Sequence, residues 1–166
     1  VKQTGGSGKL FFGPEAGDAG KYRHIEALLQ NAGIQAELTE NILAEVWAKY
    51  IFVGPLSAVT SMLEKRFGEI LEDQASQRML QGMIAEVALI AQRRGIVLPG
   101  DIIARSLEKA ASFPYDTKSS MQLDVEKGRR AELETFVGYV VTSGRELGIK
   151  TPLYQRAYAQ LAGRIA

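Results

Sequence analysis

The stretch NILAEVWAKYIFVGPLSAVTSMLEK, from Asn41 to Lys65, decides the fold class of this chain. It is strongly apolar, and Thr39 just ahead of it is a residue type that caps helices, so a helix is predicted to begin near Asn41. A proline inside a helix removes a hydrogen bond, so we expect Pro55 to kink or split this helix. From this stretch onward the sequence changes from short apolar runs to helical periodicity.

Helical spacing of apolar residues continues to the end of the chain. Glycine and proline mark where helices stop and start, as at Gly95, Gly148 and Pro152. The pattern predicts helices over Glu69–Arg94, Asp101–Ser112, Ser119–Leu147 with a break at Gly128, and Pro152–Gly163. Residues 39–166 are therefore predicted to form an all-α domain.

The first 38 residues follow a different pattern. Short apolar runs at Leu10–Phe12 and Ile34–Leu38 flank a segment of helical spacing at Lys21–Asn31. This is one β-α-β unit, typical of the tail of a larger α/β sheet. Because so few strands do not make a stable sheet alone, and because the chain opens on Val1 rather than Met, we expect a fragment.

Composition excludes several classes of site. Lys and Arg total 20 and Asp and Glu total 19, a balance that gives no reason to expect nucleic acid or an anionic membrane as partner. Cysteine is absent and His24 is the single histidine, so no metal site built on these residues and no Ser-His-Asp triad of usual form is expected. The sequence shows no apolar run of membrane-spanning length and no signal peptide, so a cytoplasmic location is expected.

Two charged residues lie in apolar surroundings. Lys49 follows Trp47 in the apolar helix, where it either extends to solvent or points into a cleft to donate a proton. Glu132 falls on or beside the apolar stripe of the segment 119–147. It pairs with Arg129 or Arg130, or is an acid at a helix N-terminus just after Gly128, or serves as a carboxylate in a site.

A third candidate group is the serine pair Ser119-Ser120 with Asp124. These residues either cap a helix and lie on the surface of its first turns, or the serines bind an anion together with the free backbone N–H groups at the helix N-terminus.

Several segments, taken in order, resemble the ketopantoate reductase (2-dehydropantoate 2-reductase) family. They are W-x-K at Trp47 to Lys49, SSM-x-x-D at Ser119 to Asp124, G-R-R-x-E at Gly128 to Glu132, the glycine of F-V-G-Y at Gly138, and G-I-x-T-P at Gly148 to Pro152. The resemblance covers essentially the whole chain. It implies a mainly α fold, the multi-helix C-terminal domain of the 6-phosphogluconate dehydrogenase C-terminal-like type, over residues 39–166. Residues 1–38 would then be the tail of a nucleotide-binding domain.

The resemblance also implies roles for single residues. This family reduces ketopantoate to pantoate with NADPH, on the route to pantothenate and coenzyme A. By resemblance, Lys49 protonates the developing alkoxide, Glu132 helps to hold substrate and positions the lysine, and Ser120 binds the substrate carboxylate. NADP would be bound mainly by a domain missing from this chain, since the sequence has no GxGxxG loop. The chain alone would be inactive, and a homodimer is among the expected assemblies.

The sequence departs from the family pattern four and eight residues after Lys49. The family usually has asparagines that contact substrate there, whereas this chain has Val53 and Ser57. Ser57 is kept as a substrate-binding candidate, but Val53 offers no hydrogen bond. Two alternatives therefore stay open, a reductase of a different 2-oxo acid and a non-catalytic helical interaction module. A relative of the β-hydroxyacid or 6-phosphogluconate dehydrogenases fits the motifs less well.

Overall fold

The computed structural model describes residues 8–164, so the first seven residues of the predicted segment 1–38 lie outside the described part. The chain divides into two compact units, the first ending at Val46 and the second beginning at Trp47. The boundary expected after residue 38 stays a prediction.

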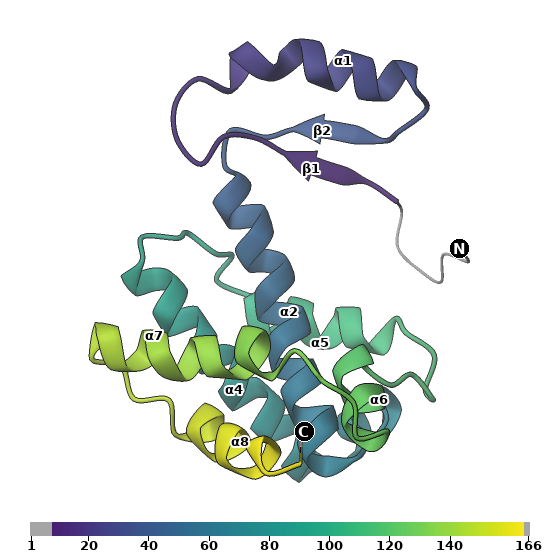
Figure 1. Ribbon diagram of the computed structural model, residues 1–166, viewed down its shortest axis with the longest axis vertical. Helices are drawn as coiled ribbons and strands as arrows, with labels where there is room; N and C mark the ends of the chain where they lie inside the picture. The colour runs from purple at the N-terminus through teal and green to yellow at the C-terminus, as the bar shows by residue number, and fades with distance from the viewer. Residues whose placement is uncertain (1–7, 165–166) are drawn as a thin grey trace. The chain divides into compact units, whose positions relative to one another are not determined.

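The first unit is the predicted β-α-β stub (Figure 1). Strands β1 (Leu10–Phe12) and β2 (Ala36–Leu38) pair in parallel, with Leu10 opposite Ala36. The connection carries a 3₁₀ turn, η1 (Ala19–Tyr22), and helix α1 (Arg23–Asn31). Glu26 and Gln30 of α1 fasten the helix to β2, since Glu26 Oε1 accepts from the Leu38 N–H at 2.8 Å and Gln30 Nε2 donates to the Ala36 carbonyl at 2.9 Å.

The second unit is the predicted all-α domain, gathered around helix α2 (Figure 1). Its core includes fully buried residues such as Ile51 and Val59 of α2, Met83 and Ile84 of the fourth helix, and Tyr154 of the last. The elements are α2 (Ile42–Leu63), α3 (Phe67–Glu72), α4 (Gln74–Arg93), α5 (Ile102–Ala111), α6 (Ser120–Glu126), a π-helical turn η2 (Glu134–Gly138), α7 (Tyr139–Leu147) and α8 (Pro152–Ala162).

Helix α2 corrects two expectations. It is not split at Pro55, because residues 54–62 are all buried and their packing offsets the one lost hydrogen bond, whereas a kink at Pro55 stays a prediction. The residue that caps its start is Asn41, whose Oδ1 accepts from the Ala44 N–H at 3.2 Å, while Thr39 Oγ1 accepts from the Asn41 N–H at 3.1 Å.

The length and composition of α2 also correct the statement that no segment approaches a membrane span. By these two measures the helix is long and apolar enough to cross a bilayer, with a mean hydropathy of 1.4 in its most apolar window. A core helix of a soluble protein passes the same test, and residues 54–62 of α2 are buried among the other helices.

The helix predicted over Glu69–Arg94 is two helices, α3 and α4. Asp73 ends the first with extended backbone and caps the second, accepting from the Ala75 N–H at 3.2 Å and the Ser76 N–H at 3.4 Å. Lys65 Nζ donates to the same carboxylate at 2.5 Å, and this hydrogen bond holds the pKa of Asp73 well below its usual range. An N-cap inside an apolar periodic pattern thus starts a new helix.

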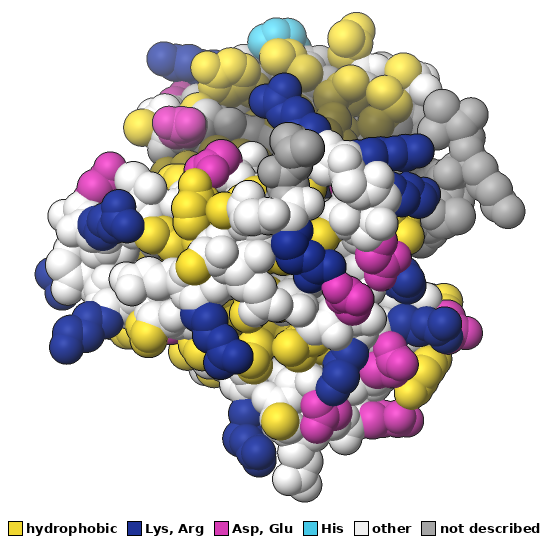
Figure 2. Space-filling model, turned by 60° about the horizontal axis from the view of Figure 1, so that its bottom comes forward, with side chains coloured by type: hydrophobic (Ala, Val, Ile, Leu, Met, Phe, Trp, Pro, Cys, Tyr) yellow, Lys and Arg dark blue, Asp and Glu magenta, His cyan; other side chains and the backbone are white. Residues whose placement is uncertain are grey.

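The face drawn in Figure 2 carries Lys and Arg side chains interspersed with Asp and Glu. No broad field of one sign covers this face, which matches the near balance of charged residues in the sequence.

Candidate functional site

Helix α2 carries the first row of candidate residues. Lys49, Val53 and Ser57 are four residues apart and so lie on one face of the helix. Lys49 is exposed, Val53 is half-buried and Ser57 is only 3% exposed, so the row descends from the surface into the helical unit. Thr60, fully buried, continues the same face one turn further on.

The chain segment that carries Glu132 packs against the same helix. The Tyr50 O–H donates to the Thr135 carbonyl at 3.0 Å, and an added Cβ at Gly54 would lie 3.7 Å from the Phe136 carbonyl oxygen. The break expected at Gly128 is confirmed, since residues 127–132 connect α6 to the helix that begins at Leu133, and Glu132 lies at the end of this connection rather than within a helix. Glu132 is exposed at the start of that helix, where its carbonyl accepts from the Phe136 N–H at 3.0 Å.

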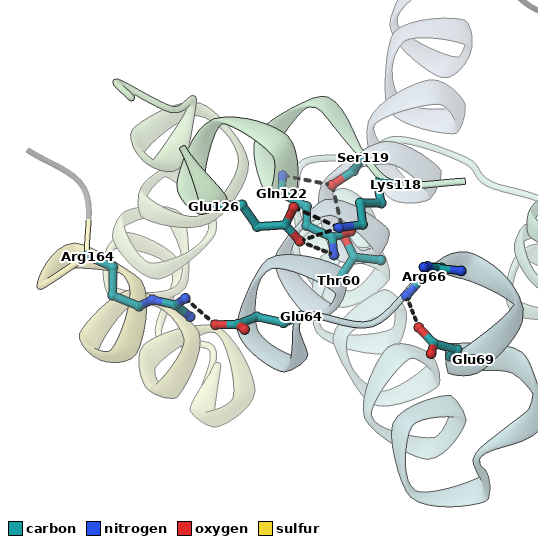
Figure 3. A network of polar contacts seen from close by, with 9 residues as sticks. All are labelled: Thr60, Glu64, Arg66, Glu69, Lys118, Ser119, Gln122, Glu126 and Arg164. Carbon is teal, nitrogen blue, oxygen red and sulfur yellow. Dashed lines mark hydrogen bonds and ion pairs between the residues drawn. The ribbon is translucent and has the colours of Figure 1, made fainter. Parts of the chain in front are cut away.

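The serine pair is fastened to the other end of the row. Ser119 is the N-cap of α6, accepting from the Gln122 N–H at 3.1 Å, and its hydroxyl lies 2.8 Å from Thr60 Oγ1 in a buried hydrogen bond (Figure 3). The capping role expected for Ser119 is confirmed. Ser120, the next residue, has an exposed side chain.

Charged groups around α6 reinforce this attachment (Figure 3). Lys118 Nζ donates to both Glu126 oxygens at 2.8 and 2.9 Å, and Gln122 Nε2 donates to Oε1 of the same carboxylate at 2.9 Å. The hydrogen bond from Lys118 lowers the pKa of Glu126. The Glu126 carboxylate therefore stays ionised. Its hydrogen bonds with Lys118 tie the residue that precedes Ser119 and Ser120 to the end of α6.

An aromatic contact lies on the opposite flank of α2. The Phe52 ring stacks on Phe113 with centroids 6.0 Å apart, and Lys109 Nζ lies 4.7 Å above the Phe52 ring. The row that begins at Lys49 therefore lies between the Phe113 loop on one side and the η2 turn on the other, with the start of α6 at its buried end.

These contacts place residues 135–136 and Ser119 against α2, but within residues 8–164 no hydrogen bond or ion pair joins Lys49 to Glu132 or to Ser120. Between residues 8 and 164 no ion pair joins Glu132 to Arg129 or Arg130, the pairing considered from the sequence. Sequence reasoning missed Tyr50 and Thr60. Thr60 was detectable as a hydroxyl residue eleven positions along the same helical face, whereas the contact of Tyr50 with Thr135 leaves no local signal.

The described residues form a multi-helix domain that follows a short β-α-β unit. The family model described as "Ketopantoate reductase PanE/ApbA C terminal" matches residues 41–164. The chain belongs to the ketopantoate reductase family.

Curated relatives are similar to most of this chain. The uncharacterized oxidoreductase YkpB of Bacillus subtilis is 26% identical over 164 residues, covering 97% of this chain and 54% of that protein. The 2-dehydropantoate 2-reductase of Nostoc sp. is 28% identical over 142 residues, covering 85% of this chain and 44% of that protein. The chain thus spans about half the length of the curated relatives it matches.

Solved structures show the same fold. A PanE/ApbA family ketopantoate reductase from Ralstonia eutropha matches with a TM-score of 0.83 at 23% identity, over 95% of this chain and 51% of that one. D-mandelate dehydrogenase, solved with NADH and anilino(oxo)acetate, matches with a TM-score of 0.85 at 19% identity, over 98% of this chain and 68% of that one.

Proposed function

We propose that this chain is the substrate-binding part of an NADPH-dependent reductase that converts ketopantoate to pantoate in the cytoplasm, on the route to pantothenate. The observation that carries the proposal is the convergence on α2: the helix that bears Lys49 contacts both the turn after Glu132 and the cap beside Ser120. The family membership of residues 41–164 supports it.

The chemistry assigned to these residues follows from the charge that develops in carbonyl reduction. A nicotinamide cofactor bound by the whole protein would supply the hydride, and negative charge would then build on the substrate oxygen. The Lys49 ammonium stabilises that oxygen and donates the proton that makes the alcohol. Glu132 orients the ammonium and holds substrate, and Ser120 donates a hydrogen bond to the substrate carboxylate.

The cofactor itself does not fit the residues present here. The 166 residues contain no GxGxxG loop, and the described part of the first unit offers only strands β1 and β2 with α1 between them. We therefore assign NADPH binding to a dinucleotide-binding domain outside this sequence. A homodimer remains part of the proposal, since one of the structural neighbours, from Staphylococcus aureus, is described as dimeric.

One observation favours a second candidate, a reductase of a different 2-oxo acid. Val53 lies half-buried between Lys49 and Ser57 on the proposed substrate face, and it offers an apolar surface instead of a hydrogen bond. D-mandelate dehydrogenase, a structural neighbour, is named for mandelate, a different acid from pantoate. A panel of 2-oxo acids separates the two candidates: turnover of another acid in preference to ketopantoate would support the second.

The test of the residue roles uses the full-length reductase, with NADPH oxidation as the readout. Lys49→Met and Glu132→Gln are each expected to lower kcat by about 100-fold or more, the usual contribution of a positioned acid–base group. Lys150→Met and Glu108→Gln are the matched controls, since both side chains are exposed and neither lies in the proposed site. Unchanged kcat in Lys49→Met and Glu132→Gln, with folded protein, would contradict the assigned roles.

A further inference from the structure

The turn that follows Glu132 has unusual backbone geometry. Residues Glu134–Gly138 form a π-helical turn between Leu133 and the regular helix α7. Such turns are rare, appear mostly as single insertions in α-helices, and are frequent at functional sites. Because its hydrogen-bond pattern differs from that of the flanking helix, contacts from outside the turn help to determine where its first residues lie.

The Tyr50 hydroxyl provides such a contact from α2. It donates to the Thr135 carbonyl at 3.0 Å and lies 3.5 Å from the Phe136 carbonyl, so it acts on the backbone of the turn itself. Burial raises the pKa of Tyr50 well above its usual range. The phenol therefore remains a neutral donor at every pH at which the enzyme would work.

The Tyr50 ring is itself fixed by other aromatic rings. It meets Trp47 edge to face with centroids 5.9 Å apart, and Tyr139 likewise at 5.7 Å. A second tyrosine touches the turn differently: the Tyr158 O–H donates to the Glu134 carboxylate at 2.6 Å, an exposed side chain rather than the backbone. Within residues 8–164, Tyr50 supplies the hydrogen bonds that join the backbone of this turn to the helix that bears Lys49.

We infer that Tyr50 is a positioning residue for the proposed reductase reaction. Its hydroxyl holds the π-helical turn so that Glu132, three residues before Thr135, stays fixed relative to Lys49, the neighbour of Tyr50 on α2. The inference rests on the proposed function, because it assigns Tyr50 an effect that acts through Glu132.

The experiment compares Tyr50→Phe with wild type in the full-length reductase. Phenylalanine keeps the ring contacts and removes only the hydroxyl. We expect kcat to fall about fivefold, the effect of losing one hydrogen bond, while KM for the 2-oxo acid stays within about twofold. Tyr139→Phe is the matched control: it belongs to the same aromatic cluster, and its hydroxyl makes no hydrogen bond within residues 8–164, so kcat should not change.

A double-mutant cycle separates positioning from simple stabilisation. If Tyr50 acts through Glu132, Tyr50→Phe has almost no further effect on the residual kcat of Glu132→Gln. An equal loss in both backgrounds, or wild-type kcat in Tyr50→Phe, would overturn the inference and leave the proposed function standing. Wild-type turnover in Glu132→Gln itself would instead overturn the proposed role of Glu132, and the inference with it.

Discussion

Tyr154 carries a hydroxyl into the buried core of the helical unit. The residue is fully buried, its hydroxyl has no hydrogen-bond partner between residues 8 and 164, and an added Cβ at Gly54 would lie 3.8 Å from it. Burial raises the pKa of Tyr154 well above its usual range, so the group stays neutral. A buried hydroxyl without a partner has lost its bonds to water and gained none in return.

We therefore predict that Tyr154→Phe stabilises the protein, by about 1 kcal/mol, because an unpaired buried polar group costs roughly 1–3 kcal/mol. Urea unfolding followed by circular dichroism measures the change. Tyr50→Phe serves as the opposite case, since its hydroxyl is bonded to the Thr135 carbonyl and its removal should destabilise. A loss of stability in Tyr154→Phe would show that its hydroxyl is satisfied in the folded protein.

Single residues were predictable from the sequence where their signal is local. The Ser119 cap is such a case, because N-cap chemistry involves residues three positions apart. The candidates Lys49, Ser120 and Glu132 were found through short motifs, and their roles stay predictions. The Tyr50 contact was not predictable, because its partner Thr135 lies 85 residues away and a hydroxyl-to-carbonyl bond leaves no pattern in one sequence.

At the scale of elements, helix α8 shows how a cap can come from a distant helix. Thr151 and Pro152 stand at its start as the sequence predicted, but the Thr151 side chain makes no capping bond. Glu86 of α4 replaces it, accepting from the Leu153 N–H at 3.0 Å and the Tyr154 N–H at 3.2 Å. The carboxylate is 7% exposed, and this burial raises its pKa above the ordinary value of 4.5.

Glu86→Ala is predicted to lower the free energy of unfolding by about 2 kcal/mol, since two buried N–H groups lose their acceptor. Glu86→Gln keeps a similar side chain that does not titrate, so comparison with wild type isolates the effect of Glu86 protonation on stability. With a raised pKa, the folded state keeps its proton to a higher pH than the unfolded state, so this group's stabilising contribution is complete below 4.5 and is lost as the pH rises through the folded-state pKa. Urea unfolding from pH 4.5 to 7 should therefore show wild type losing stability relative to Glu86→Gln, and parallel curves would contradict the shift.

The sequence pattern predicted the helices and the break at Gly128, but it did not predict the division at Asp73 or the continuity at Pro55. The Asp73 cap divides a segment whose apolar spacing continues across it, whereas Pro55 does not divide α2 because the buried residues around it stabilise the continuous helix. The spacing of apolar residues is compatible with either one continuous helix or two helices at both places. Tertiary packing and side-chain hydrogen bonds determine which of the two forms.

At the scale of the whole molecule, the two units differ in what they supply. The helical unit contains every candidate catalytic and substrate residue, from Lys49 to Glu132. The first unit contributes a pair of strands, η1 and α1 in its described part, and the connection after β1 contains Gly13, Gly17 and Gly20 but not the GxGxxG spacing typical of a dinucleotide-binding turn.

We predict that the 166-residue chain alone folds as a helical protein but does not bind NADPH or oxidise it with any 2-oxo acid. The full-length reductase should do both under the same conditions. NADPH at 100 times its dissociation constant would stabilise a binding protein by about 2.7 kcal/mol, so a thermal shift in the full-length reductase and none in the 166-residue chain is the expected pair of results. A comparable shift in the 166-residue chain would place the cofactor site within these residues, because ligand stabilisation requires a site that exists in the folded chain.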